Sequence, residues 1–311
     1  RSQGHDLIVV STKPAAGHCR VVLASAAYHS CSEGYRRALR REMDALRATW
    51  GAGSARTLAA DHVAADVAGA ENPADRLKAW RFVCARACDP GVRLLKADPS
   101  AGVKPPKREK GEHPDWTADE VARYRARWRI GTSKRAAFEL LFWTAARAED
   151  GCKLGPGMVD RDGLLTYRQG KTDFLAHCPW DCPLPAYAAG WEEDRRTLKD
   201  ALKALAGHMT FLAAHGRTRS EKGLVTMIRT AAREAGVEKS AHGLRKTRAR
   251  MLAEARATAH EIVAWTGHQT LKEAERYTRA ADRRRAVMGE PEKAPGANGA
   301  AQVRKRQKRT A

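Results

Sequence analysis

The chain has 311 residues, with 57 Lys and Arg against 36 Asp and Glu, and therefore a formal net charge of +21. This length allows two modest domains with a sizeable buried core, so an enzyme is possible. The positive charge predicts a polyanionic partner, because each phosphate that a cation neutralises releases condensed counterions. No apolar run approaches the roughly 18 residues that a membrane-spanning helix needs. We therefore expect a soluble intracellular protein whose partner is nucleic acid and not a membrane.

Seven cysteines are an odd number, and none is paired at the C-x-x-C spacing of a structural zinc site. We predict reduced thiols that serve mainly as packing residues, and no metal. Cys178 and Cys182, beside His177, form the one cluster in which a metal role stays open.

Residues 1–24 show no sustained hydrophobic period and receive no assignment. Residues 25–104 are typical of helices with one apolar and one cationic face. Two sets of apolar residues recur at helical spacing: Leu39, Met43, Leu46 and Trp50 in the first, and Leu77, Trp80, Phe82, Val83 and Ala87 in the second. The cationic faces are either simply solvated or in contact with nucleic acid, and the net charge favours contact.

Residues 105–113 are rich in Pro, Gly and Lys and are interpreted as an interdomain linker. A second domain, residues 114–288, begins with a capping box in which Thr117 and Glu120 would satisfy backbone amides of a new helix. Residues 289–311 form a basic tail without the apolar content to fold, and we expect it to be disordered.

Arg147 follows a predicted helix whose apolar stripe is Ala136, Ala137, Leu140, Leu141 and Thr144. It extends that stripe, three residues past Thr144, and is expected to point toward the protein. An inward guanidinium needs an anion, because an unpaired buried charge is very costly. Glu149, Asp150 or a bound phosphate could each be that anion, and the sequence does not decide among the three.

Residues 164–185 have β-type composition around a Gly-Lys turn that contains Lys171, and they predict a short hairpin. The predicted fold class is therefore mainly α with a small β-hairpin, an α+β arrangement in two domains.

His242 and Arg245 lie three residues apart at a predicted helix start, so their side chains are neighbours. Unpaired amides and the positive dipole end of a helix suit a phosphate, and Gly243 would let a ligand approach the backbone. The alternative is an ordinary surface His and Arg on a cationic helix.

Two further capping boxes are predicted downstream, Thr258 with Glu261 and Thr270 with Glu273. Gly267 would end the first of these helices and place His268 in a tight junction. Tyr277 follows on the second helix, where its hydroxyl either reaches toward His268 or lies at the edge of the core.

In this order the segments resemble the tyrosine recombinase (phage integrase) family. The matching segments are "TAARAED" with Arg147, "RQGKT" with Lys171, "HGLRKT" with His242 and Arg245, "TGHQT" with His268, and "ERYTRAAD" with Tyr277. Ala145 departs from the Gly that is common in the first box and leaves Arg147 in place. Five ordered segments are far more specific than any one of them.

The resemblance implies a helical core-DNA-binding domain at 25–104 and a catalytic domain at 114–288. It implies that Tyr277 is the nucleophile of DNA cleavage through a 3′-phosphotyrosyl intermediate, with no metal or other cofactor. Among the other matched residues it makes Arg147 and Arg245 the ligands of the phosphate oxygens, His242 the proton acceptor, His268 a hydrogen-bond donor and Lys171 the general acid.

The resemblance further implies specific sites on double-stranded DNA, a homotetramer on that DNA, and a possible directionality factor. The segment "RAADRRRAVM" after Tyr277 would contact a neighbouring protomer, or would be a charged terminal helix. We expect a bacterial cytoplasmic, nucleoid-associated protein. The alternatives are a degenerate integrase that binds DNA without catalysis, a type IB topoisomerase-like enzyme, and a basic RNA-binding protein.

Overall fold

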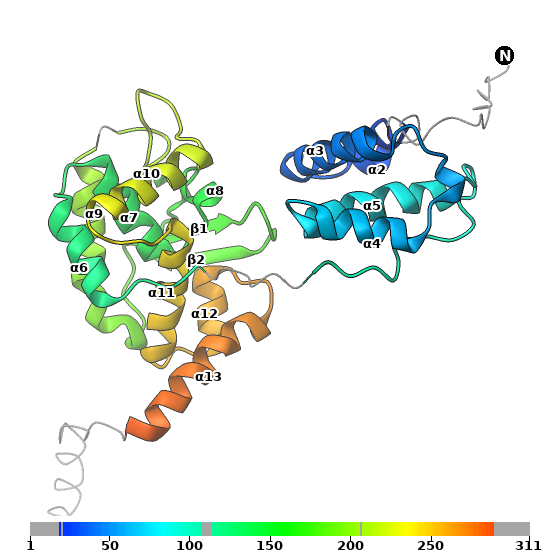
Figure 1. Cartoon of the computed structure of the whole chain (residues 1–311). Coiled ribbons are helices and arrows are strands. Elements are labelled where there is room, and N and C mark those ends of the chain that lie inside the picture. Colours follow the sequence, from blue (N-terminus) through cyan, green and yellow to red (C-terminus); the bar gives the residue numbers. More distant parts are fainter. Residues whose placement is uncertain (1–18, 20, 107–112, 206, 289–311) are drawn as a thin grey trace, which may run out of the picture. The chain divides into compact units, whose positions relative to one another are not determined.

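The computed structural model describes residues 19, 21–106, 113–205 and 207–288 (Figure 1). The chain divides into two compact units, Arg1–Lys110 and Gly111–Ala311. Both consist mainly of helices, and the second also contains a two-stranded antiparallel sheet, so the predicted fold class is confirmed. The predicted basic tail and most of the predicted linker lie outside the described residues. No described helix is long and apolar enough to cross a membrane.

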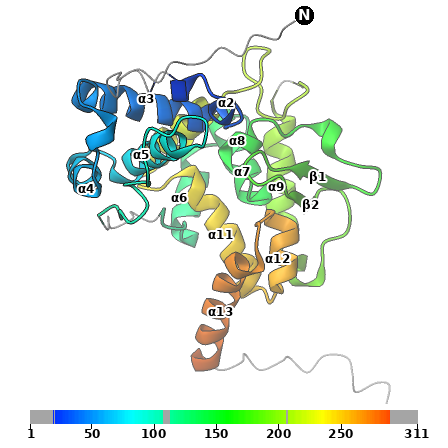
Figure 2. The same ribbon diagram turned by 90° about the vertical axis from the view of Figure 1, so that its right-hand side faces the viewer.

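The first unit contains the helices α2 (Ala26–His29), α3 (Glu33–Trp50), α4 (Ala60–Gly69) and α5 (Pro73–Cys88), with a 3-10 turn at Ala55–Thr57. Figures 1 and 2 show α3 and α4 packed along α5. The predicted apolar positions on α3 and α5 form its core, except that Trp50 and Phe82 are only partly buried. Cys19 and Val22 are also buried in this core, which therefore begins before residue 25.

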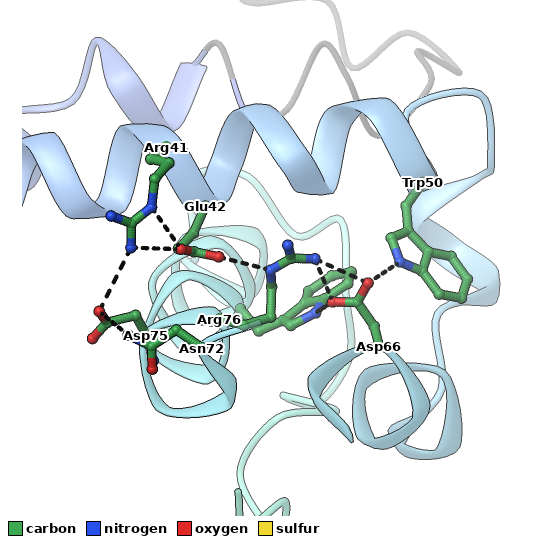
Figure 3. Close-up of polar contacts among 8 residues, drawn as sticks. Arg41, Glu42, Trp50, Asp66, Asn72, Asp75 and Arg76 are labelled. Atoms are coloured by element: carbon green, nitrogen blue, oxygen red, sulfur yellow. Dashed lines mark hydrogen bonds and ion pairs between the residues drawn. The ribbon is translucent and has the colours of Figure 1, made fainter. Parts of the chain in front are cut away.

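A buried polar cluster joins the three longer helices of this unit (Figure 3). Both carboxylate oxygens of Asp66, on α4, accept hydrogen bonds from Arg76 Nη1 at 3.1 Å. The indole N–H groups of Trp50 and Trp80 donate to the same carboxylate at 2.9 and 2.7 Å. Arg76 Nε donates to Glu42 Oε2, on α3, at 3.0 Å. Asp66 thus satisfies donors from α3 and α5 at once.

Replacing Asp66 by Ala is expected to lower the free energy of unfolding of the first unit by about 3–5 kcal/mol, the cost of removing one partner of a buried ion pair. The variant would leave two indole N–H groups and one side of a guanidinium unsatisfied. The matched control is Asp61→Ala, an exposed carboxylate in the first turn of the same helix, with an expected loss below about 1 kcal/mol. Urea unfolding of the intact chain, with amide hydrogen exchange in α4 and α5, measures both. Equal losses in the two variants would contradict the assignment.

The second unit contains α6 (Ala118–Arg127), α7 (Ser133–Thr144), α8 (Ala148–Gly151), α9 (Glu192–Lys203), α10 (Glu221–Glu234), α11 (Ala241–Glu254), α12 (Ala259–Thr266) and α13 (Leu271–Met288). The 3-10 turns lie at Pro156–Met158 and Ala186–Trp191. Helix α7 is central, with α9, α10 and α11 against it. Every side chain from Arg135 to Thr144 is buried. The prediction that only one face of this helix is buried was therefore too narrow. A helix covered on all sides has no solvent face for polar residues to mark.

Helix starts in this unit follow local side-chain chemistry. The predicted capping boxes at Thr117 with Glu120 and at Thr258 with Glu261 are both present. The box predicted at Thr270 with Glu273 is wrong, because the Glu273 amide donates to the main-chain carbonyl of Thr270 instead of its hydroxyl. Helix α13 packs against α11 and α12, and its C-terminal end projects beyond them (Figures 1 and 2).

The predicted hairpin is formed by β1 (Leu164–Arg168) and β2 (Leu175–Pro179), with Thr166 opposite His177. Its turn, residues 169–174, carries Lys171, and α12 packs against β2. The cluster considered for a metal is dispersed, since His177 pairs with Thr166 and the buried Cys178 thiol faces main-chain carbonyls. All seven cysteines are free thiols, and four of them are buried: Cys19, Cys84, Cys152 and Cys178.

Candidate active site

One cavity of about 640 Å³ in the second unit is lined by all six residues singled out from the sequence. They come from separate elements: Arg147 from the start of α8, Lys171 from the hairpin turn, His242 and Arg245 from α11, His268 from the α12–α13 junction, and Tyr277 from α13. The lining also includes Lys246, Arg250, Arg276 and Arg284, which sequence reasoning did not select. Seven Lys and Arg face three acids, so the cavity suits a polyanion.

Arg245 is the most constrained of these groups. Its side chain is buried, and its Nη1 donates to the carbonyl oxygens of Ala145 at 2.8 Å and Thr266 at 2.6 Å. Its Nη2 is buried without a hydrogen-bond partner among the described residues. Burial, and next the nearby Arg147, lower the pKa of Arg245 to about 10. A buried donor left unpaired is costly, so a phosphate oxygen would be a favourable partner.

Arg147 reaches the cavity by a different route from the one predicted. Helix α7 ends at Thr144, and Ala145 adopts a left-handed conformation with φ of 53°. Arg147 then lies in extended conformation at the N-cap of α8, so it does not continue the α7 stripe. Its Nη1 donates to Oε1 of Gln169. Neither acidic candidate forms an ion pair with it in the described part of the chain.

Ala145 stands where the family resemblance leads us to expect Gly, and it adopts the left-handed conformation that glycine favours. Glycine adopts positive φ without the steric cost that a Cβ brings, on the order of 1 kcal/mol. Ala145 adopts it here, and its carbonyl still receives the Arg245 hydrogen bond.

His242 lies in the first turn of α11, as predicted, and is exposed. Its ring meets that of His113 edge to face, with 5.3 Å between centroids. Desolvation by the surrounding protein, followed by His113 and Arg245, lowers the pKa of the His242 imidazole. Gly243 does not serve a ligand, because a Cβ there would lie 2.5 Å from the Pro114 carbonyl oxygen. This glycine instead lets the segment before α6 pack against the helix start.

Gly267, with φ of 65°, ends α12 as predicted and turns the chain so that His268 is buried in the junction. Nδ1 of His268 lies 2.5 Å from the Thr266 hydroxyl oxygen. The ring of Tyr277 is 6.0 Å from that of His268, centroid to centroid, at an interplanar angle of 39°. Tyr277 is partly buried, which raises its pKa, while Arg245 acts in the opposite direction. Tyr277 thus lines a cationic cavity, and its net pKa shift is upward, so the phenol keeps its proton until a base accepts it.

Burial, and next Arg245 and Arg147, lower the pKa of His268 to about 3. The folded protein therefore keeps this imidazole neutral where the unfolded chain, with an ordinary pKa of 6.5, binds a proton. Above pH 6.5 the two states do not differ. As the pH falls below 6.5, the stability that His268 contributes is lost progressively.

We expect His268→Gln to flatten this acid dependence. Between about pH 6.5 and 5 the free energy of unfolding of the wild type should fall more steeply than that of the variant, by an extra slope that rises to about 1.4 kcal/mol per pH unit near pH 5. Urea unfolding at a series of pH values measures the two slopes. Parallel slopes would mean that His268 titrates normally in the folded protein.

Gln169 contacts this site through Arg147, and the sequence reasoning did not select it. It is fully buried and lies two residues before Lys171. The alternation of side chains along a strand could have indicated this residue. Leu165, Tyr167 and Gln169 are two residues apart and all are buried on the same side of β1 and its continuation. A polar residue at the inward register of a strand indicates a buried hydrogen-bonding role.

Comparison with known proteins shows which family this chain resembles. The profile of the phage integrase family matches residues 118–284, more than half of the chain. The tyrosine recombinases XerC of two Bifidobacterium longum strains, DJO10A and subspecies infantis, are 30% identical over 149 residues, 46% of this chain and 42% of theirs. The chain thus spans less than half the length of these curated relatives.

Solved structures share the fold. A lambda integrase dimer bound to a COC′ core site has a TM-score of 0.68 at 20% identity, over 90% of this chain and 98% of that one. A lambda integrase tetramer bound to a Holliday junction has a TM-score of 0.71 at 18% identity, over 88% and 84%. The Tn1549 transposon integrase in complex with circular intermediate DNA has a TM-score of 0.61 at 12% identity, over 89% and 100%.

The fold and the cavity define a helical protein with a cationic site built around a tyrosine. With the family profile matched over more than half its length, the chain belongs to the phage integrase family of tyrosine recombinases, and the predicted resemblance is confirmed.

Proposed function

We propose that this chain is a site-specific DNA recombinase that cleaves and rejoins DNA strands through a 3′-phosphotyrosyl link to Tyr277. The observation that carries the proposal is the cavity in which Tyr277, two histidines, Lys171 and two arginines meet. The unpaired, buried Nη2 of Arg245 supports a phosphate as the ligand. The TM-scores and the family profile support the same class of activity.

Cleavage of a phosphodiester passes through a phosphorane that carries additional negative charge. Guanidinium groups bind its oxygens in a fixed geometry, and Arg147 and Arg245 take this role. Because they are held before DNA arrives, their hydrogen bonds need little reorganisation during the reaction. Arg245 is the better fixed of the two, by two main-chain carbonyls.

The Tyr277 hydroxyl loses its proton as it attacks phosphorus, and a neutral imidazole is the suitable acceptor. His242 takes that proton, because its lowered pKa keeps it neutral at pH 7 and it lines the same cavity as Tyr277. His268 is the proposed hydrogen-bond donor to the phosphate. Because the Thr266 hydroxyl donates to the Ile262 carbonyl and therefore accepts from Nδ1–H of His268, Nε2 becomes a donor when the imidazole is protonated, which a bound phosphate favours.

The bond to the 5′ oxygen breaks as the tyrosyl bond forms, and that oxygen needs a proton. Lys171 supplies it from the exposed hairpin turn, where an ammonium on a long side chain can follow a departing atom. The free 5′ hydroxyl later attacks the phosphotyrosyl bond of a partner strand, and Tyr277 leaves with its proton returned. The proposal assigns no metal or cofactor to these steps.

The proposed partner is double-stranded DNA with specific recombination sites, on which four protomers assemble. Residues 25–104 would contact the DNA as a core-binding domain and residues 114–288 would be the catalytic domain. The exposed end of α13 would contact a neighbouring protomer, and a directionality factor would set the sense of the reaction. Lambda integrase bound to a Holliday junction as a tetramer supports this assembly.

Two alternatives share the fold with this proposal. A degenerate integrase would bind DNA without cleaving it, and a type IB topoisomerase-like enzyme would cleave without exchanging strands. The presence of all six residues in one cavity favours the recombinase over the degenerate binder.

The test uses a nicked suicide duplex that carries the attachment site from the DNA flanking the gene of this protein. A recombinase forms a protein–DNA adduct that resists denaturant and joins strands between two sites. Band shifts without an adduct would identify a DNA-binding protein. Relaxation of supercoiled DNA that lacks the site would identify a topoisomerase.

A further inference from the structure

Gln169 connects parts of the candidate active site that are distant in the sequence. Its Oε1 accepts a hydrogen bond from Arg147 Nη1, and its Nε2 donates to the main-chain carbonyl of Thr266. The Gln169 side chain is fully buried; its bond to Thr266 is buried and its bond to Arg147 is partly buried. A hydroxyl from Thr172 also reaches Oε1, at 3.2 Å.

The Thr266 carbonyl is shared with the second arginine. Arg245 Nη1 donates to it at 2.6 Å. One carbonyl oxygen therefore joins the Gln169 amide to Arg245, and Gln169 joins that carbonyl to Arg147. The Thr266 hydroxyl, on the same residue, pairs with His268.

Gly267 makes room for this arrangement. A Cβ on Gly267 would lie 2.2 Å from Nε2 of Gln169 and 2.8 Å from its Cδ. The glycine at the end of α12 is thus required by the close approach of the amide as well as by its positive φ.

The hydrogen bond from Arg147 to Gln169 matters because Arg147 and Arg245 are both cations. Arg147 lowers the pKa of Arg245, which means that the two cations repel each other before phosphate binds. Arg245 is held by two carbonyls, whereas Arg147 has Gln169 as its hydrogen-bond partner. Without that partner the guanidinium of Arg147 would be free to turn toward solvent, because its side chain is only partly buried.

An amide is suited to this position for a chemical reason. It accepts from a guanidinium and donates to a carbonyl at the same time, without carrying charge. A carboxylate would satisfy Arg147 but would face the Thr266 carbonyl with a second lone pair and would neutralise the field that attracts phosphate.

We propose that Gln169 is a positioning residue for DNA cleavage, which holds Arg147 at a set distance from Arg245 so that both meet one phosphate. The inference rests on the proposed function. Gln169 does not touch the reacting atoms and acts through Arg147. Arg245 has two main-chain carbonyl partners of its own and is not positioned by a contact with Gln169.

The experiment compares Gln169→Met, which keeps the shape and removes both hydrogen bonds, with Gln169→Asn, which keeps the amide and is too short to span them. Thr166→Val is the matched control, because it removes a side-chain hydrogen bond from the other face of the same hairpin. Single-turnover adduct formation at saturating suicide duplex gives the rate, and a band-shift titration gives the affinity.

We expect both Gln169 variants to lower the rate on the order of 100-fold, the effect of misplacing a catalytic group by about 1 Å. DNA affinity and the urea midpoint should stay near those of the control. In the background of Arg147→Ala, adding Gln169→Met should cause no further loss, since the residue acts through an arginine that is already absent.

The outcomes separate this inference from the proposed function. If the wild type forms no adduct, the proposed function fails. If the wild type reacts and Gln169→Met reacts equally fast, or if its loss multiplies with that of Arg147→Ala, the positioning role is wrong. Should Gln169→Met fail to fold, Gln169→Asn in the same cycle decides the question by the same criteria.

Discussion

Tyr277→Phe is expected to abolish the covalent adduct with suicide DNA, with a loss on the order of 10⁶-fold, as for removal of other catalytic nucleophiles. The substitution removes only the phenolic oxygen that forms the bond to phosphorus. The ring would keep its place beside His268, on the helix that Ala274 anchors in the core. DNA affinity should therefore remain unchanged in a band-shift titration.

Tyr187→Phe is the matched control. Tyr187 is a partly buried tyrosine of the same unit, which packs on the core and does not line the cavity. Its variant should form the adduct at the wild-type rate. Mass spectrometry of the trapped peptide should place the nucleotide on Tyr277. An adduct that persists in Tyr277→Phe, or that maps to another residue, would disprove the assignment of the nucleophile.

Arg245→Lys is expected to lower the rate of adduct formation by about 100- to 1,000-fold, the typical cost of losing one oxyanion donor. Lysine keeps the charge, but a single ammonium cannot donate to two carbonyls and a phosphate oxygen in the fork geometry of a guanidinium. The carbonyls of Ala145 and Thr266 would lose their shared partner. Single-turnover cleavage at saturating DNA measures the effect.

Arg248, one turn further along α11, provides the contrast. It is also buried and its Nη1 is also unpaired among the described residues, but it does not line the cavity. Its Nε donates to the Phe142 carbonyl at 2.9 Å, its Nη2 pairs with Asp194, and its guanidinium lies over the rings of Phe142 and Trp191. Arg248→Lys should therefore reduce stability and leave the cleavage rate of the folded protein unchanged. If both variants lost rate equally, Arg245 would be a structural cation of the same kind and not a ligand of phosphate.

Residues close together along the chain were sufficient to predict many of the helix ends, the hairpin and the family of this protein. Two capping boxes and the glycine end of α12 were predicted correctly, because each depends on residues within four positions along the chain. The H-x-x-R spacing correctly placed His242 and Arg245 on one turn of a helix start. The hairpin followed from its composition and its Gly-Lys turn. The order of these segments was enough to identify the family, since the profile matches the same region.

Contacts between distant segments were decided by the tertiary structure alone. The Arg245 guanidinium binds the carbonyl of Ala145, 100 residues away, and Gln169 reaches Thr266 across 97 residues. Arg147 enters the cavity because Ala145 reverses the chain at positive φ, where a continuous helix would have turned it elsewhere. Gly243 accommodates another segment of the protein and not a ligand. Helix caps and turns are determined by neighbours along the chain, whereas the partner of a buried guanidinium depends on which carbonyls packing brings to it, and no local pattern encodes that.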